Sequence, residues 1–206
     1  MLLRNMSRAC RSWRTFLIQD SSIWTRLDFS TAGKTPSFST VKAYVKRSNC
    51  KVELFATSRS SIDQKPSLFY VADRCKRLRE LHYNMNPAGG SLLQATRALP
   101  NLRKLVTSGT TDITADDSCN ILSHCRQLEH VEFQRVLDIH SLDESNDPQM
   151  EDLPNLRVLT MNARTGILYS GAFGILQRVR LALMVVSQQP RMALVYFLFH
   201  LLGKWS

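Results

Sequence analysis

The side chains best suited to metal chemistry lie in the stretch CNILSHC, where Cys119, His124 and Cys125 stand close together in the sequence. Zinc sites need paired ligands such as C-x-x-C, with a second pair further along the chain. The chain has no such second pair, and Cys125 falls on an expected apolar helix face. We therefore predict no metal site and no cofactor.

Catalytic patterns are also missing elsewhere in the sequence. NPAGGS lacks the Gly-Lys ending of a phosphate loop, and G-x-S-x-G does not occur in the chain. Asp116 and Asp117 are adjacent, so they would face different sides of a helix. A capping role at a helix N-terminus fits them better than acid–base chemistry. The sequence therefore predicts a protein that is not an enzyme.

A recurring spacing of apolar residues accounts for most of the chain. The stretch LRELHYNMN places Leu78, Leu81 and Tyr83 at relative positions 0, 3 and 5, with Asn86 at position 8. Similar spacings, weaker in the second unit, start at positions 24, 52, 78, 102, 128 and 156, so the gaps are 28, 26, 24, 26 and 28 residues. Leucine-rich repeats have periods of about 20–29 residues. The phrase LPNLR also occurs twice in the same phase, at 99–103 and 153–157.

Helices are expected between these predicted strands. Leu68, Val71, Ala72 and Cys75 have the i, i+3, i+4, i+7 spacing of one helical face, and three other units repeat it in whole or in part. Segment 138–152 breaks the rule, since it holds six acids and no Lys or Arg. It is predicted to be a loop, with a contact for a basic partner as the alternative. The fold class is thus α/β, a leucine-rich-repeat solenoid with parallel strands on its concave side and helices outside.

Polar residues between the leucine positions are the candidates for binding a partner. Strand side chains alternate, so these residues should point away from the core, onto the concave face. Leu54 and Ala56 hold the same positions in the second unit. The alternative is that such residues are merely solvated. The predicted substrate-binding residues are Glu80, His82, Lys104, His130, Glu132 and Thr160.

Charge and cysteine content limit the possible partners and compartments. The 206-residue chain has a net charge of +10, but the charges are spread along it without interleaved aromatic residues, so no nucleic-acid partner is predicted. Five cysteines at irregular spacing do not suggest a disulfide framework. Cys75 and Cys125 hold positions that are leucine in other units, which predicts buried free thiols. We expect a reducing compartment, the cytoplasm or the nucleus.

The N-terminal stretch ACRSWRTFLIQDSSIWTRLDFS, residues 9–30, carries a second pattern. Ala9, Trp13, Phe16 and Leu17 share one helical face, and DSS then breaks the helix. The stretch resembles the C-terminal half of an F-box, and with the repeats the chain resembles F-box/leucine-rich-repeat proteins of the fungal type, over about residues 6–165. The residues that match the motif are Cys10, Trp13, Arg14, Phe16, Leu17, Asp20, Ile23, Trp24, Leu27 and Asp28.

The resemblance implies the substrate receptor of an SCF-type (cullin–RING) ubiquitin ligase. In that family the F-box binds a Skp-type adaptor and the repeats hold an unknown protein substrate. The first F-box helices, with their L-P-x-E start, are absent here. The same residues could therefore cap the apolar end of the solenoid. Further alternatives are a repeat scaffold without a ubiquitin-ligase link and a truncated, non-functional fragment. The adaptor-binding residues carried over are Cys10, Trp13, Phe16, Leu17 and Trp24.

Three regions follow from these patterns. They are a partial F-box over 1–22, leucine-rich repeats over 23–165 and an atypical tail over 166–206. The apolar run MALVYFLFHLL in the tail, residues 192–202, is too short for a bilayer, which needs about 20 residues. Three interpretations stay open: a helix that covers the last unit, a membrane-surface helix, and non-native sequence from a shifted reading frame. A membrane partner is expected only under the second.

Overall fold

The computed structural model describes most of the chain between the first predicted strand and the last. The residues described are 15, 19–32, 36–57, 65–84, 89–108, 113–137, 154–163, 183–188 and 193–198. Cys10, Trp13, Phe16 and Leu17 lie outside them, as does the acidic segment 138–152. The described part has the predicted α/β fold, in which a row of helices lies against a largely parallel sheet.

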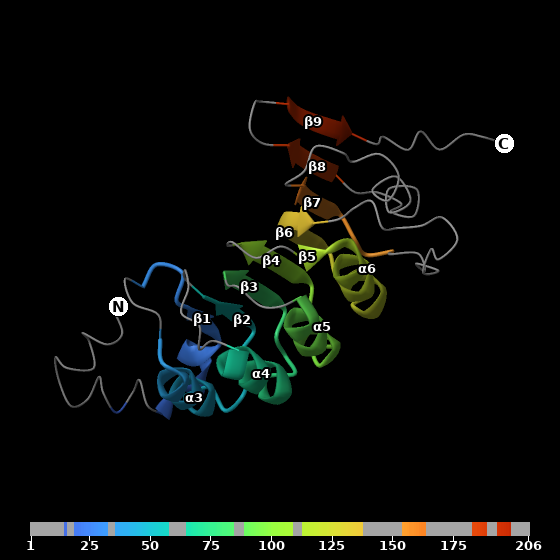
Figure 1. Ribbon diagram of the computed structural model, residues 1–206. Helices are drawn as coiled ribbons and strands as arrows, with labels where there is room; N and C mark the ends of the chain where they lie inside the picture. The colour runs from blue at the N-terminus through green and yellow to red at the C-terminus, as the bar shows by residue number, and fades with distance from the viewer. Residues whose placement is uncertain are drawn as a thin grey trace.

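The strands of this sheet stand side by side in chain order, as Figure 1 shows. They are β1 (Arg26–Asp28), β2 (Leu54–Ala56), β3 (Glu80–Asn84), β4 (Lys104–Ser108), β6 (His130–Leu137), β7 (Val158–Ala163), β8 (Leu183–Gln188) and β9 (Ala193–Leu198). The short β5 (Ile113–Thr114) pairs with the end of β6, and only β8 and β9 pair antiparallel in the described sheet.

The register confirms the predicted parallel strands. Leu105 of β4 pairs with Leu81 on one side and with Val131 on the other. Val131 in turn pairs with Leu159 of β7. Equivalent residues of successive units, about two dozen positions apart in the sequence, therefore become neighbours across the sheet.

The helices lie next to one another on one side of the sheet (Figure 1). They are α3 (Phe38–Arg47), α4 (Lys65–Arg74), α5 (Gly89–Arg97) and α6 (Ala115–His124), with a 3-10 turn η1 (Ser21–Trp24) before β1. Each of the four carries the apolar face expected from its spacing, and in α4 the residues Leu68, Val71 and Ala72 are fully buried. The predicted helices between the strands are thus confirmed.

The cap of α6 differs from the expected one. Thr114 is the N-cap residue, and its hydroxyl accepts a hydrogen bond from the backbone N–H of Asp117 at 3.1 Å. Asp116 and Asp117 were expected to cap the helix, but they lie within its first turn. A β-region residue just before the helix is the one whose side chain can reach the free N–H groups, and Thr114 has that conformation.

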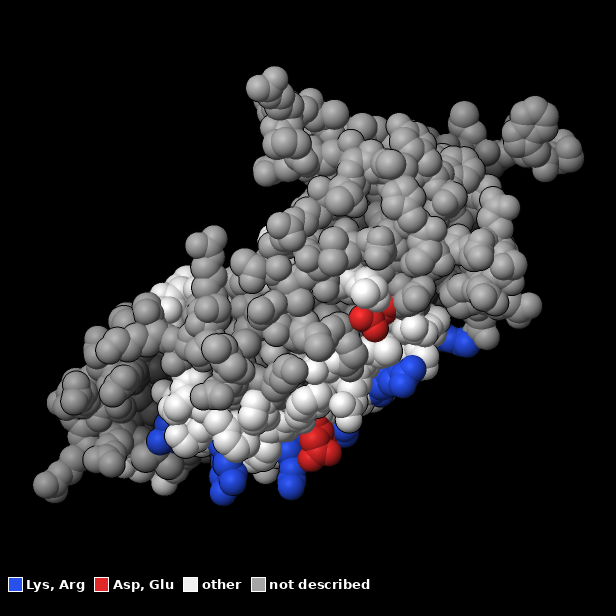
Figure 2. Space-filling view, in the orientation of Figure 1, with Lys and Arg blue, Asp and Glu red and all other residues white. Residues whose placement is uncertain are grey.

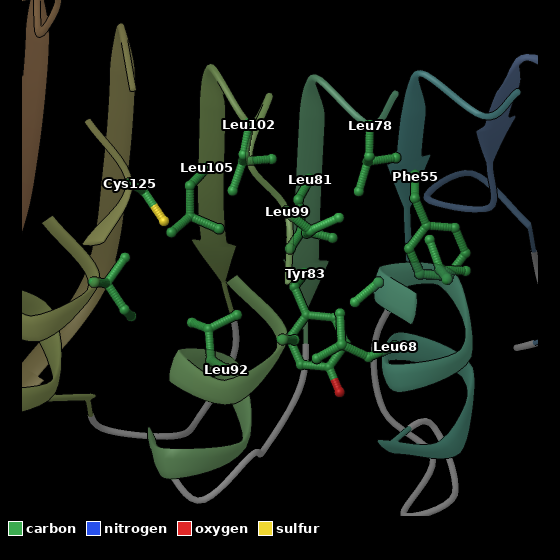
Figure 3. Packing of buried hydrophobic residues seen from close by; sticks show 14 of the residues in the cluster. Phe55, Leu68, Leu78, Leu81, Tyr83, Leu92, Leu99, Leu102, Leu105 and Cys125 are labelled. Atoms are coloured by element: carbon green, nitrogen blue, oxygen red, sulfur yellow. The ribbon is translucent and has the colours of Figure 1, made fainter. Parts of the chain in front are cut away.

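A single layer of apolar side chains fills the space between sheet and helices. Figure 3 shows Leu81 and Leu105 from the strands meeting Leu68 and Leu92 from the helices. All four are 0 % exposed. Cys75 and Cys125 lie in the same layer as free thiols, which confirms their prediction as core residues. Burial raises the pKa of the Cys75 thiol to about 12 and that of Cys125 to about 11.

The repeated phrase LPNLR has a structural reason. The side-chain amide of Asn101 donates a 2.8 Å hydrogen bond to the backbone carbonyl of Lys76 in the preceding unit. Asn155 donates in the same way to the carbonyl of Arg126, at 3.1 Å. Each asparagine thereby satisfies a carbonyl just after a helix end, where helical partners are missing. The phrase thus joins one turn to the next.

The tail departs from expectation. Residues 183–188 and 193–198 form β8 and β9, so a helix is wrong for these two segments. Valine and aromatic residues favour strands, and the edge of β7 offers unpaired backbone groups with which β8 pairs over six residues. In the described part of the chain, no helix has the length and apolar character that crossing a bilayer would require.

Candidate binding face of the sheet

The candidate site is the face of the sheet that points away from the helices. Its side chains form two rows that cross the strands, because each residue pairs with its equivalent in the next unit. The first row consists of Arg26, Leu54, Glu80, Lys104, His130 and Val158. The second consists of Asp28, Ala56, His82, Val106, Glu132 and Thr160.

Alternation along each strand produces these rows. In β4 the buried Leu105 separates Lys104 from Val106, and both of these are half-buried. Since neighbouring side chains of a strand point to opposite faces, the two outer residues share the open face. The short strands β1 and β3 follow the same rule around Leu27 and Leu81, which are buried.

All six predicted substrate-binding residues lie in these two rows. Glu80, Lys104 and His130 are consecutive in the first row. Glu132 and Thr160 are adjacent in the second, while Val106 separates Glu132 from His82. Each of the six is half-buried, and none is fully withdrawn from the surface. The structure thus brings together residues that are up to 80 positions apart in the sequence, from Glu80 to Thr160.

Two histidine–carboxylate pairs occupy the centre of the face. On β6, Nε2 of His130 lies 2.6 Å from Oε1 of Glu132, a hydrogen-bonding distance with the ring N–H as donor. On β3, Nε2 of His82 lies 3.6 Å from Oε2 of Glu80. Both pairs join residues two positions apart on one strand. Both residues of each pair therefore lie on the open face.

His82 differs from an ordinary surface histidine. Partial burial lowers its pKa, and the positive charge of Lys104 on the next strand lowers it further. Glu80, Asp28 and Glu132 act in the opposite direction but do not cancel these effects. The Nε2 atom of His82 is buried without a hydrogen-bond partner. His82 is thus neutral near pH 7, since the ordinary histidine pKa of 6.5 is already below this pH.

The two apolar positions of β2 are not accessible, contrary to the prediction that they face a partner. Leu54 is 5 % exposed and Ala56 is 2 % exposed. Both stand between longer side chains of β1 and β3. A guanidinium nitrogen of Arg26 reaches to 3.6 Å from a carboxylate oxygen of Glu80, so this ion pair spans the strand that carries Leu54. The side chains of the neighbouring strands therefore account for part of the burial of Leu54 and Ala56.

Arg26 is a charged residue of the face that the sequence prediction omitted. It holds the same repeat position as Glu80 and Lys104, one residue before the buried strand centre. The signal for Arg26 in the sequence is its position directly before Leu27, the apolar strand residue of the first unit. Arg26 and Asp28 bring opposite charges to the end of the face that β1 forms.

Trp24 is the one predicted adaptor-binding residue that the structure describes. Its ring is 9 % exposed and belongs to the hydrophobic core. It stacks on Tyr44 of α3, with ring centroids 5.0 Å apart, and the guanidinium of Arg47 lies 5.5 Å from its centre. A ring in this position covers the first unit of the core. This favours the capping alternative for Trp24 over contact with an adaptor.

The open face carries side chains of several chemical kinds. It combines carboxylates, imidazoles, ammonium and guanidinium groups, and small apolar residues on rigid strands. The described residues contain no group of three or more His, Cys, Asp or Glu side chains placed to hold a metal ion. Comparison with known families and with curated proteins finds no match to this chain. The assignment of function therefore depends on the geometry and on the resemblance of the motifs.

Proposed function

We propose that the chain is a leucine-rich-repeat solenoid that binds a protein partner on the open face of its sheet. The observation that supports this most directly is the register, which aligns the half-buried polar residues of four successive strands into two rows. An open face with mixed charges suits a protein surface better than a small molecule, which needs a deep and mostly apolar pocket. Histidine, carboxylate and lysine groups held on strands give such a surface its specificity.

The more specific proposal is a substrate receptor of an SCF-type ubiquitin ligase, located in the cytoplasm or the nucleus. Its support is the resemblance of residues 9–30 to part of an F-box, followed directly by the repeats. The receptor would contribute binding only, while the ligase supplies the chemistry. The substrate would lie on the open face, and a Skp-type adaptor would bind the N-terminal residues around Trp13 and Phe16.

A scaffold without a ligase link, or a truncated fragment, is the alternative, and the burial of Trp24 favours it. Pull-down of the folded chain with a purified Skp-type adaptor separates the two. The receptor proposal expects binding that Trp13→Ala with Phe16→Ala abolishes while the far-UV circular dichroism stays unchanged. A folded chain that does not retain the adaptor would refute the ligase link and leave the scaffold.

The open face itself is tested by photo-crosslinking from single positions. A photoreactive residue placed at Thr160 lies on the face, and one placed at Lys42 lies exposed on helix α3. We expect protein crosslinks from position 160 that are missing from position 42. Crosslinks of equal yield from both positions would contradict the assignment of the face, whatever the adaptor result.

A further inference from the structure

A second charged surface lies along one edge of the molecule, where each helix ends and the next strand begins. Arg74 and Arg97 are in the last turns of α4 and α5. Arg79, Arg103 and Arg157 each stand one residue before a strand. Figure 2 shows Lys and Arg side chains following the lower rim of the described part, with few acidic side chains among them. We call this surface the basic edge.

Backbone hydrogen bonds place the residues that precede the strands side by side, so that Arg79 and Arg103 are neighbours and Glu129 separates Arg103 from Arg157. The N–H of Arg103 donates to the carbonyl of Arg79 at 2.8 Å. The N–H of Glu129 donates to the carbonyl of Arg103 at 2.7 Å, and Arg157 follows in the same way at 2.8 Å. Adjacent strands are about 4.8 Å apart, so Arg79 and Arg103 place two like charges side by side. On its other side Arg79 adjoins Glu53, whose carbonyl accepts the N–H of Arg79 at 2.8 Å, so acidic residues border the two arginines on both sides.

Structural roles explain only part of this charge. The ammonium group of Lys76 donates to the carbonyls of Ala72 and Ala98, at 3.0 and 3.1 Å. Arg103 forms a 3.0 Å ion pair with Glu129. Arginines in the last turn of a helix also complement its dipole, which gives Arg97 a role.

Arg77 and Arg79 have no such role. They follow the end of α4, so they are not part of its last turn. Both are exposed, and among the residues described neither forms an ion pair. Their charge is therefore available to a partner.

We propose that the basic edge binds an acidic segment of a partner protein. The surface is separate from the open face of the sheet, so the inference goes beyond the proposed function. Arginine is the cation suited to carboxylates, because its planar fork matches their two oxygens. The described turns of the edge, from α4 to β7, contain no aromatic residue on which bases could stack. Glu129, within the arginine row, would repel a continuous phosphate backbone but can be matched by a protein segment of mixed charge.

Binding of the full chain to a fluorescein-labelled oligoglutamate, followed by fluorescence anisotropy, tests this proposal. An oligoglutamine of equal length is the neutral control probe. The edge variant is Arg77→Gln with Arg79→Gln, and the matched control is Lys42→Gln with Lys46→Gln. Both variants remove two positive charges, but Lys42 and Lys46 are exposed on α3, before the basic edge begins at α4 and away from the open face.

The edge variant should raise the Kd for oligoglutamate by roughly five- to thirtyfold. It removes two arginines, and each exposed ion pair is worth up to about 1 kcal/mol. The control variant should change it by less than about twofold, and oligoglutamine should not bind. Arg97→Gln, a single exposed substitution, should weaken binding by a smaller factor in the same direction. The position of the charge, and not the net charge of the chain, then decides affinity.

Three results would overturn the proposal. Equal weakening in the edge and control variants would mean that binding follows net charge alone. Tighter binding of a duplex RNA of the same total charge, lost in the edge variant, would reassign the edge to nucleic acid. Tighter binding of vesicles containing phosphatidylserine would reassign it to a membrane surface. None of these results depends on the open face, because crosslinking from position 160 tests that proposal separately.

Discussion

Leu105→Ala tests whether the inward row of side chains holds the molecule together. Leu105 is 0 % exposed and pairs in register with Leu81 and Val131. The substitution removes three carbon atoms, worth about 2.4 kcal/mol at about 0.8 kcal/mol for each buried methylene. The cavity left behind adds to this, so the free energy of unfolding should fall by about 3 to 4 kcal/mol.

Val106→Ala is the matched control, because it changes the next residue of the same strand. Val106 is half-buried on the open face, so its loss should cost less than about 1 kcal/mol. Urea denaturation followed by circular dichroism measures both variants. With an m value of about 2 kcal/mol per molar urea, Leu105→Ala should lower the midpoint by about 1.5 to 2 M. If Val106→Ala destabilised the protein as much as Leu105→Ala, the assignment of the two faces would be refuted.

Three further predictions concern single interactions. Asn101→Ala removes the hydrogen bond to the carbonyl of Lys76 and should lower the free energy of unfolding by about 0.5–1.5 kcal/mol, whereas no shift in a thermal melt would show that this bond is not stabilising. The pKa of His82 is lower in the folded than in the unfolded chain, so the unfolded state binds more protons and stability is lost as pH falls below 6.5. His82→Gln should therefore flatten the profile of unfolding free energy against pH in this range. An unchanged slope would contradict the lowered pKa of His82. Cys75 and Cys125, with thiol pKa values raised to about 12 and about 11, should resist iodoacetamide at pH 8 in the native protein and react in urea, as peptide mass spectrometry would reveal; rapid native labelling would place them outside the core.

Much of the fold follows from local spacing. The strand period, the apolar faces of the helices and the burial of both cysteines all depend on which residues within one unit are apolar. Those residues have few alternatives, because a shift of a strand by one position would expose its leucines. The same alternation placed the six candidate binding residues, including Glu80 and His130, on one face before any contact between units was known.

Contacts between units explain where prediction failed. Leu54 and Ala56 are buried on the open side, in part because β1 and β3 flank them with longer side chains. The tail segments are strands because the exposed edge of β7 pairs with β8, and local hydrophobicity contains no information about that edge.

What the sequence determined and what the tertiary structure decided differ for one physical reason. The repeat spacing alone specified which side chains turn inward, since that depends on dihedral angles within each short segment. Only the tertiary structure decided which side chains of different units meet, because hydrogen bonds between strands set their register. That register creates the pairing of Arg26 with Glu80 and the row of Arg79, Arg103 and Arg157. Charges that look scattered along the chain thereby gather on one edge.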